Sequence, residues 1–341
     1  MDQEIRVSHR ALIAAVDRAL AQVHVPANVR EVEARTMVEA DLQGVPSHGV
    51  RMLPPLLAAI REKRITANPR TNLDRDNGAT CLFDGDRGPG RFVATRAMEH
   101  AIERAGRFGV GLCLARRTSH WGRAHAYASQ AAQAGLIGLC ATNAIPVMLA
   151  WGSSRPLLGN NPLAIAVPHA PDPVVLDIAM SQAAYGKIGT YRREGRKIQP
   201  GWGLDAEGQP TDDPAAILAT RRLLPMGGHK GAGLALMIEL LTGALAGGML
   251  SQEIAAIDAT GQDADSSKLF LAIDTGAFGP PDRFAERVTD MLAYLRTSEP
   301  EAGIKFPGER GWQTRARYLA EGIPLHAEIV EQLAEIGLRF P

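Results

Sequence analysis

Residues 223–248, LLPMGGHKGAGLALMIELLTGALAGG, form the most strongly patterned stretch of the chain. The stretch opens on a glycine-rich turn at 227–233 and continues with apolar residues at nearly every position, interrupted by Glu239. A helix that is apolar on every side must be buried on every side. A run of roughly 15 residues is also too short to cross a bilayer. The pattern therefore predicts a helix inside the core of the fold.

Two basic side chains, His229 and Lys230, stand at the start of this predicted helix. Free amide N–H groups, the positive end of the helix dipole and an ammonium group all favour a bound anion there. The alternative is that the glycines only allow close packing and that both side chains are solvated. The local pattern leaves these two interpretations open.

Composition indicates an ordinary globular protein. The 341 residues are enough for one large or two medium domains. The 37 basic and 37 acidic residues give a formal net charge of zero, so neither nucleic acid nor an anionic membrane is an expected partner. We find no apolar leader and no run of transmembrane length, and we expect a cytoplasmic protein. The three cysteines, Cys81, Cys113 and Cys140, cannot all pair, and Cys113 and Cys140 lie in apolar runs, which predicts that these two are small core residues in a reducing compartment.

Hydrophobic spacing predicts a mixed α/β body flanked by helical segments from both chain ends. Helices are expected at 9–24, 92–107, 123–134 and 284–295, and two more within 309–337. A further helix is expected to start at Asn28, with Glu31 completing a capping box. The first 70 residues contain no convincing strand. Strand-like runs occur at 81–83, 110–115, 136–142, 163–167, 174–178 and 269–274, with a turn at 84–90 and a surface excursion at 186–222. Because strands and helices do not alternate regularly, we do not expect an all-parallel sheet.

The predicted boundaries follow from these elements. A helical N-terminal part covers residues 1–75, an α/β body covers 76–280, and a C-terminal helical part covers 281–341.

Several common motifs are missing from the sequence. There is no Gly-x-Gly-x-x-Gly after a strand, no Walker loop and no Gly-x-Ser-x-Gly elbow. The zincin motif is also absent, and His120 and His125 have the wrong spacing for one helical face, so we expect no metal site.

Two polar clusters remain besides the turn at 227–231. The first is Ser47-His48-Gly49, with Arg51 just beyond it, and the second is Ser119-His120-Trp121-Gly122, directly after a predicted strand. An imidazole suits proton transfer to or from a carbinol oxygen, and an arginine suits a carboxylate. The alternative for each histidine taken singly is a structural role in a turn, capping backbone groups.

Together these clusters resemble the malate/L-lactate dehydrogenase family that is distinct from the Rossmann-type malate and lactate dehydrogenases. The family includes ureidoglycolate, sulfolactate and malate dehydrogenases, diketogulonate reductase and piperideine-2-carboxylate reductases. The matching stretches are DLQGVPSHG at 41–49, SHWG at 119–122, GNNP at 159–162, LDIAMS at 176–181, LPMGGHKG at 224–231 and FPGER at 306–310. They follow the family's order and cover nearly the whole chain.

The resemblance implies a fold of its own, with a dinucleotide-binding domain around a largely antiparallel sheet and a helical domain built from both chain ends. It also implies a homodimer with the active site near the subunit boundary. By the same resemblance His120 and His48 are the proton-transfer candidates, with Ser47 beside the substrate and with Arg51 and Ser119 as substrate-binding candidates. The implied cofactor is NAD or NADP, held by Thr142, Asn143, Ala144, Asp177, Ile178, Ala179, Met180, Ser181, Lys230, Gly308, Glu309 and Arg310.

Three positions depart from the family pattern. Met52 stands where the family usually has arginine, Ser119 replaces an asparagine, and Ile145 stands where ureidoglycolate dehydrogenases would have an acidic residue. Malate and ureidoglycolate are therefore disfavoured as substrates.

Three functions follow from the sequence. The leading hypothesis is an NAD(P)-dependent dehydrogenase of a small 2-hydroxy acid, or reductase of the matching 2-oxo acid. The second is a cyclic ketimine reductase, which needs the same hydride and a proton for nitrogen. The third is a non-catalytic ligand-binding relative, against which the presence of His48, His120 and Lys230 argues.

Overall fold

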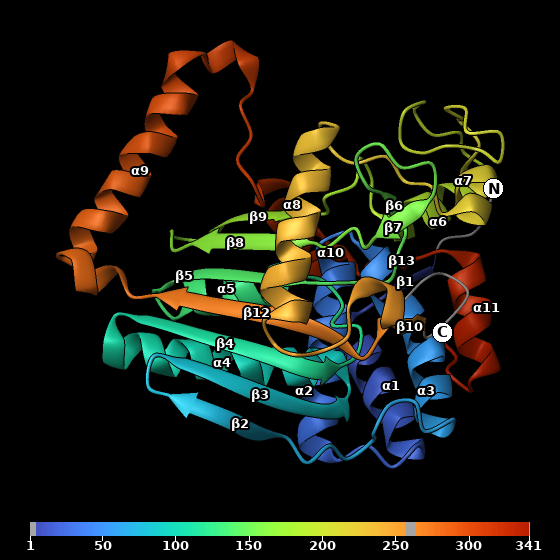
Figure 1. Ribbon diagram of the computed structural model, residues 1–341, viewed down its shortest axis with the longest axis horizontal. Helices are drawn as coiled ribbons and strands as arrows, with labels where there is room; N and C mark the ends of the chain where they lie inside the picture. The colour runs from blue at the N-terminus through green and yellow to red at the C-terminus, as the bar shows by residue number, and fades with distance from the viewer. Residues whose placement is uncertain (1–4, 257–262, 341) are drawn as a thin grey trace.

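The computed structural model describes residues 5–256 and 263–340. Its centre is a seven-stranded sheet with the strand order β2-β3-β4-β12-β5-β8-β9 (Figure 1). The strands are β2 Asn72–Asn77, β3 Thr80–Gly88, β4 Val110–Thr118, β5 Ile137–Thr142, β8 Leu163–Val167, β9 Val174–Ile178 and β12 Ser266–Ile273. Only β3 and β4 run parallel, and every other neighbouring pair is antiparallel. The expected largely antiparallel mixed sheet is confirmed.

Strand β12 occupies the middle of the sheet although it is the last of these seven strands in the sequence. Its Phe270 is paired with Cys113 on one side and Cys140 on the other, and all three residues are fully buried. Cys81 is buried as well, and all three cysteines are free thiols. The interpretation of Cys113 and Cys140 as small core residues is confirmed.

Helices cover both faces of the sheet. Helices α4 (Gly90–Phe108) and α5 (His125–Gln133) lie behind it in Figure 1, and α8 (His229–Glu239) crosses the front. Helix α4 packs on β4 and β12 through buried Val93, Ala97, Met98 and Ala101. Below them lie α1 (His9–Gln22), α2 (Ala27–Leu42) and α3 (Leu53–Arg61), joined by the short turns η1 (Pro46–His48) and η2 (Val50–Met52).

The two chain ends meet, as the resemblance implied. Strand β1 (Ile5–Val7) pairs antiparallel with β13 (Ile323–Leu325), and α10 (Glu309–Glu321) contacts α2. Helix α11 (Ala327–Glu335) completes this layer, whereas α9 (Pro281–Ser298) projects from the body and has no buried residue (Figure 1). The exact domain boundaries stay a prediction.

Three local predictions are wrong. The first 70 residues do contain a strand, β1, which is too short to show periodicity and pairs with residues more than 300 positions away. Helix α2 begins at Ala27, so Asn28 lies inside its first turn and is not the N-cap; the N-cap is Pro26, which has no side-chain donor or acceptor to cap the helix. The turn expected at 84–90 is instead a bulge within β3, where Asp86 and Arg87 have positive φ and Asp84 accepts a hydrogen bond from the Asp86 amide at 2.7 Å.

The excursion at 186–222 is more structured than a surface loop. It carries most of α6 (Tyr185–Arg193) and all of α7 (Pro214–Thr220). These helices pack with the small sheet of β6 (Met148–Leu149) and β7 (Pro156–Leu158) around a second apolar cluster that includes Tyr185, Ile188 and Ile217. A further pair of two-residue strands, β10 (Ala255–Ala256) and β11 (Asp263–Ala264), lies beyond α8.

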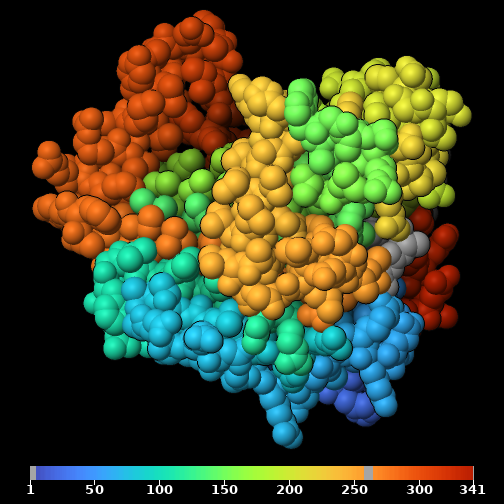
Figure 2. Space-filling view, viewed as in Figure 1, coloured from blue at the N-terminus to red at the C-terminus, as the bar shows by residue number. Residues whose placement is uncertain are grey.

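The prediction that the helix at 223–248 is buried on every side is wrong for the single chain. Its inner side is buried through Ala235 and Ile238, but its outer side carries exposed Leu234, Leu236, Met237, Leu240, Leu241 and Leu245, each about half exposed. Figure 2 shows this segment lying open on the front surface of the molecule.

Glu239 explains why a carboxylate interrupts that apolar run. Its oxygens accept hydrogen bonds from the Asn143 and Asn161 amides, at 3.0 and 2.9 Å, and from the backbone and hydroxyl of Ser251. The carboxylate is thus a buried, fully hydrogen-bonded group that ties α8 to the ends of β5 and β8. The helix continues beyond it as a π-helical turn at Leu240–Ala244.

No helix within the described ranges is long and apolar enough to span a membrane.

Candidate active site

His48 and His120 meet at one narrow cavity of about 70 Å³. The two imidazole rings stack with their centroids 5.8 Å apart and their planes 25° apart. His48 comes from η1 in the helical layer, and His120 lies two residues after the end of β4, an inner strand of the sheet. We call this cavity the histidine slot, and its other lining residues are Trp121, Gly122, Thr142, Ala144, Ile145, Val147, Asn160, Pro162, Ala184, Tyr185 and Gly186.

Neighbouring polar groups orient both imidazoles. The Gly122 amide donates to Nδ1 of His120 at 3.3 Å, which leaves the ring proton on Nε2 when the imidazole is neutral. The Ser47 hydroxyl lies 2.9 Å from Nδ1 of His48, so Ser47 acts on the ring that it precedes. Each histidine therefore has Nδ1 engaged within the protein, while its Nε2 makes no hydrogen bond to a residue that the structure describes.

Burial and positive charge keep both histidines neutral. Desolvation, helped by the positive charges of Arg123, Arg91 and Arg51, lowers the pKa of His48 to about 3. The pKa of His120 is also lowered well below its usual value, first by burial and then by the charge of His48. Because each ring disfavours a proton on the other, the pair carries at most one proton.

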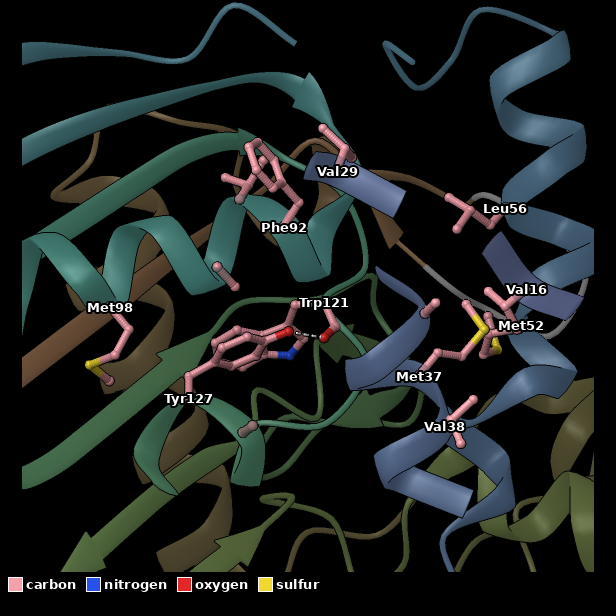
Figure 3. Close-up of a cluster of buried hydrophobic side chains, with 14 of the residues drawn as sticks. Val16, Val29, Met37, Val38, Met52, Leu56, Phe92, Met98, Trp121 and Tyr127 are labelled. Carbon is pink, nitrogen blue, oxygen red and sulfur yellow. Dashed lines mark hydrogen bonds between the residues drawn. The ribbon is translucent and has the colours of Figure 1, made fainter. Parts of the chain in front are cut away.

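Aromatic packing holds the loop of His120 in place. The indole of Trp121 stacks on Tyr127 at 5.1 Å and meets Phe270 of β12 edge-on at 5.7 Å. The Tyr127 hydroxyl donates to the Trp121 carbonyl, the interaction drawn as a dashed line in Figure 3. The residue after His120 is thus anchored to the central strand of the sheet.

Arg91 at the start of α4 braces both histidine loops. Its guanidinium donates to the His48 carbonyl at 3.0 Å and pairs with Glu33 of α2 at 3.3 Å. A Cβ on Gly122 would lie 2.8 Å from Nε of Arg91, so the loop of His120 rests against the same side chain. Arg91 and Glu33 are both buried and were missed from the sequence, where they stand far apart and in no recognisable motif.

Asp41 holds the other side of the His48 loop. Its carboxylate accepts the Val50 amide at 2.8 Å. A Cβ on Gly49 would lie 2.0 Å from the same carboxylate, so only glycine fits there. Burial raises the pKa of Asp41 to about 7, an effect that the Val50 amide and the charge of Arg91 partly offset. Asp41 stood in the quoted stretch 41–49, but its role was not predicted.

The two substrate-binding candidates lie outside the slot lining. The Ser119 hydroxyl donates to the Gly88 carbonyl at 2.9 Å, which is a buried structural contact. Arg51 is buried and lines two cavities next to the slot rather than the slot itself. Ile145, Asn160, Tyr185 and Gly186 line the slot and were not among the predicted site residues.

Cofactor candidates at the end of β5 reach the slot mainly through their backbone. Thr142 and Ala144 line it, and Asn161 supports Ala144 by accepting its amide at 3.0 Å. The side chains of Thr142 and Asn143 are occupied internally, with Thr142 donating to the Ser267 carbonyl at 3.1 Å and Asn143 donating to Glu239 at 3.0 Å.

The run at 177–181 lies beside the glycine-rich loop of Lys230. The Met226 amide donates to the Met180 carbonyl at 2.8 Å, and Ser181 forms a bridge with Pro225. A Cβ on Gly231 would lie 2.4 Å from the Met226 carbonyl and 2.7 Å from that of Met180, so the two backbones touch. Asp177 is paired with Arg123 at 2.8 Å, while Ile178 and Ala179 are partly buried between these contacts.

Gly308, Glu309 and Arg310 lie against the opposite end of β9. The Val175 amide donates to the Pro307 carbonyl at 3.0 Å, and Glu309 accepts from the Phe306 amide at 3.0 Å and pairs with Arg296 at 2.9 Å. The candidates at 177–181 and those at 308–310 thus lie toward opposite ends of β9, the first group beginning within the strand itself.

The donors present fit an anionic dinucleotide. Lys230 and Arg310 are exposed cations, and neither makes a side-chain hydrogen bond or ion pair within the described parts of the chain. Lys230 lies beside the first of these groups and Arg310 belongs to the second, and phosphate oxygens are the ligands that such cations prefer. No group of three or more His, Cys, Asp or Glu side chains able to hold a metal occurs among the residues that the structure describes.

Asp41 provides a pH-dependent prediction. Its folded pKa of about 7 lies above its ordinary value of 3.8, so the folded state holds a proton that the unfolded chain releases, and stability falls as pH rises between these values. The Asp41→Asn variant has no such proton to lose. Between pH 5 and pH 8 the free energy of unfolding of the wild type should therefore fall by about 2–3 kcal/mol more than that of the variant. Urea denaturation of both proteins measures the gap. A gap independent of pH would contradict a raised pKa.

Known proteins share this architecture over nearly their whole length. A model of the malate/L-lactate dehydrogenase family matches residues 7–334. Malate dehydrogenase from Pyrococcus horikoshii is 35% identical over 345 residues, which cover 98% of this chain and 95% of that protein. Its solved structure superposes with a TM-score of 0.89 at 32% identity, covering 99% of this chain and 96% of that one.

Two further solved structures are as similar. Sulfolactate dehydrogenase from Methanocaldococcus jannaschii has a TM-score of 0.89 at 32% identity, with 98% of each chain covered. Delta1-piperideine-2-carboxylate reductase from Pseudomonas syringae pvar. tomato has a TM-score of 0.88 at 30% identity, with 97% of this chain and 99% of that chain covered. Similarity of this extent in both sequence and fold places the chain in the malate/L-lactate dehydrogenase family of oxidoreductases.

Proposed function

We propose that this chain is an NAD(P)-dependent oxidoreductase that transfers hydride between the nicotinamide cofactor and a small 2-hydroxy or 2-oxo acid. The observation that carries the proposal is the histidine slot, where the stacked imidazoles of His48 and His120 share one cavity with the cofactor candidates Thr142 and Ala144. When bound, the cofactor supplies or accepts the hydride. The protein's own residues must then bind the acid and move one proton.

His120 is the proposed proton carrier. In reduction, His120 first takes up a proton and then gives its Nε2 proton to the substrate from the imidazolium form, after which the ring is neutral again; oxidation runs in reverse. In the imidazolium form Nδ1 also carries a proton, so its contact with the Gly122 amide opens during the reaction. His48, oriented by Ser47, is close enough that a proton on either ring discourages a proton on the other. The pair therefore works as a single acid–base unit that takes up or releases one proton as a carbinol is oxidised or a carbonyl reduced.

An acidic substrate changes the electrostatics of this unit. The positive charges of Arg91 and Arg51 lower the pKa of both histidines in the free protein. A carboxylate placed in the slot offsets that field, so its binding raises the histidine pKa and favours uptake of a proton. This coupling suits an anionic substrate and disfavours a neutral alcohol.

The second candidate function is reduction of a cyclic ketimine carboxylate. It is favoured by the similarity to the solved delta1-piperideine-2-carboxylate reductase and by the same proton carrier, which would deliver its proton to nitrogen. The third reading, a ligand-binding relative without catalysis, predicts no need for paired imidazoles held in a defined tautomer. A panel of 2-oxo acids and cyclic imines, followed at the reduced-nicotinamide absorbance with NADH and with NADPH, separates all three. No turnover with any of them would refute the proposed enzymatic function.

His120→Ala should lower turnover by roughly 10²–10⁴-fold, because the variant lacks the group that exchanges the substrate proton. Cofactor affinity should barely change, since the residue acts on the substrate. The measurement is steady-state kinetics with the best substrate of the panel, beside calorimetry with the cofactor.

His48→Ala is the matched comparison because it removes the other ring of the pair. If His120→Ala keeps near-native turnover while His48→Ala abolishes it, the roles of the two histidines are reversed. If neither variant slows the reaction by more than about tenfold, the proton travels through another group or bound water, and the mechanism is wrong.

Lys230→Ala should weaken cofactor binding by on the order of 1–3 kcal/mol, the cost of losing one charge-assisted contact to a phosphate. The basis is an exposed ammonium that pairs with none of the residues the structure describes, on a loop joined to the 177–181 run. Calorimetry with NADH and NADPH measures the effect, and Lys63→Ala, at an exposed lysine that follows α3 in the helical layer, is the control. Unchanged affinity for both cofactors would contradict this assignment.

We further propose that two copies of the chain pair through the exposed side of α8 and its continuation. Leu236, Met237 and Leu245 are exposed by 47%, 52% and 57%, and Leu234, Leu240 and Leu241 extend the same apolar surface. Contiguous apolar surface of this kind is typical of an interface. The helix would then be buried on both sides, as its sequence demands, once a second copy covers it.

The double variant Leu236→Glu/Met237→Glu should convert a dimer to a monomer, because it places two charges in an apolar interface. Sedimentation velocity at micromolar concentration measures the change. Phe108→Glu, at an exposed apolar side chain on α4, should leave the dimer intact. A wild-type monomer, or a double variant that still dimerises, would contradict pairing through α8.

A further inference from the structure

A second, larger cavity adjoins the histidine slot. It has a volume of about 1000 Å³ and shares Tyr185 and Gly186 of α6 with the slot. Figure 1 shows α6, α7 and α11, which contribute to its walls, along the same side of the molecule. Because they share these two residues, the two cavities border each other at the start of α6, and a ligand that occupies both must cross this boundary.

We call this larger cavity the distal cavity, and its wall is positively charged. It carries Arg51, Arg192 and Arg193 against a single acidic residue, Glu328. Arg193 is held by Thr190 at 3.0 Å and by Glu328 at 3.5 Å, whereas Arg192 makes no side-chain hydrogen bond or ion pair to any described residue. An exposed guanidinium without a carboxylate partner, in a cavity that continues from the slot, is suited to a second anionic group.

The rest of the wall is apolar. Met52, Pro54 and Pro55 line it from the helical layer, and Leu218 lines it from α7. Such a surface accommodates a hydrocarbon segment rather than a polyhydroxylated one, which would lose hydrogen bonds to water without regaining them. The cavity therefore combines an apolar path with a cationic end.

Helix geometry sets the distance between the two ends. Gly186 at the shared boundary and Arg192 are six residues apart on one helix, or about 9 Å at 1.5 Å per residue. Helical side chains lean toward the N-terminus, which brings the guanidinium back toward the slot and shortens this gap to several Å. A spacer of a few methylene groups bridges such a gap, and the single methylene of a four-carbon diacid does not.

We propose that the substrate is a 2-hydroxy or 2-oxo dicarboxylic acid longer than four carbons, with its distal carboxylate bound by Arg192 and Arg193. This assignment rests on the proposed function for the reacting end of the molecule. The distal carboxylate takes no part in the chemistry and contributes affinity and selectivity only.

The kinetic test compares diacids with monoacids of the same length. 2-Oxoglutarate, 2-oxoadipate and 2-oxopimelate are assayed beside oxaloacetate and the monoacids 2-oxopentanoate, 2-oxohexanoate and 2-oxoheptanoate, with both reduced cofactors. The expected result is a kcat/KM for 2-oxoadipate or 2-oxopimelate about 10–100-fold above that of its matched monoacid, carried by KM. Equal values for diacids and monoacids, or a maximum at oxaloacetate, would overturn the proposal.

Variants locate the selectivity. Arg192→Gln should remove most of the diacid preference, and Glu328→Gln should increase it, because it frees Arg193 from a competing carboxylate. Arg196→Gln is the matched control, since Arg196 is exposed on the same segment, pairs with Glu194 and does not line the cavity. A diacid preference that survives in the double variant Arg192→Gln/Arg193→Gln would place the distal group elsewhere and overturn the assignment.

Calorimetry keeps this inference separate from the proposed function. Adipate and hexanoate carry no reacting group, so their binding is measured without turnover. Adipate should bind wild type about 10–100-fold more tightly than hexanoate does, and Arg192→Gln should abolish that difference. If no 2-oxo acid is reduced but this result holds, the proposed reaction fails and the distal anion site stands. If 2-oxo acids are reduced but adipate and hexanoate bind equally, the distal site fails alone.

Discussion

The buried ion pair between Arg91 and Glu33 is the contact on which the site depends. It joins the first turn of α4, which lies on the sheet, to α2, which belongs to the helical layer. The same guanidinium donates to the carbonyl of His48 and stands against Gly122, the second residue after His120. Since desolvation offsets much of the Coulombic gain of a buried pair, its value here lies in position more than in stability. One side chain sets the spacing of two histidines that come from different layers.

The sheet provides the rigid half of this arrangement. Because β12 is central and antiparallel to both β4 and β5, the loop of His120 and the end of β5 lie on opposite sides of one strand. Phe270 of that strand packs against Trp121, and Ser267 accepts from Thr142. Glu239 then ties α8 to Asn143 and Asn161 at the neighbouring strand ends. The side chains near the slot are thus used mainly to hold backbone in place, which leaves the imidazoles as its reactive groups.

Different cavities provide the groups for proton transfer and the groups proposed for substrate selectivity. Burial, together with the charges of Arg91 and Arg51, lowers the pKa of both imidazoles, so proton exchange with the substrate is confined to the two rings of the slot. Tyr185 and Gly186 form the boundary between the slot and the larger cavity, whose wall combines arginine side chains with apolar residues. A Cβ on Gly186 would lie 3.1 Å from the Cβ of Ser47, so α6 also rests on the loop that orients His48.

Sequence alone determined the family, the free buried cysteines and the approximate strands, because each follows from local composition or from motifs in a recognisable order. It brought His48 and His120 forward as a pair, yet it could not supply the residues that hold them, since Glu33, Asp41 and Arg91 act across elements far apart in the chain. The prediction that the helix at 229–239 is buried on every side of the single chain was also wrong. An apolar pattern indicates that a surface needs to be covered, but it does not tell whether the same chain covers it. The short strand β1 escaped notice for a related reason, as three residues have no pattern until β13 pairs with them. Only the tertiary structure decided that Arg51 lines the neighbouring cavities and that Ser119 makes a structural contact. It also decided that α6 separates the slot from a cationic cavity. The physical reason is that all three depend on which surfaces meet when distant segments of the chain pack.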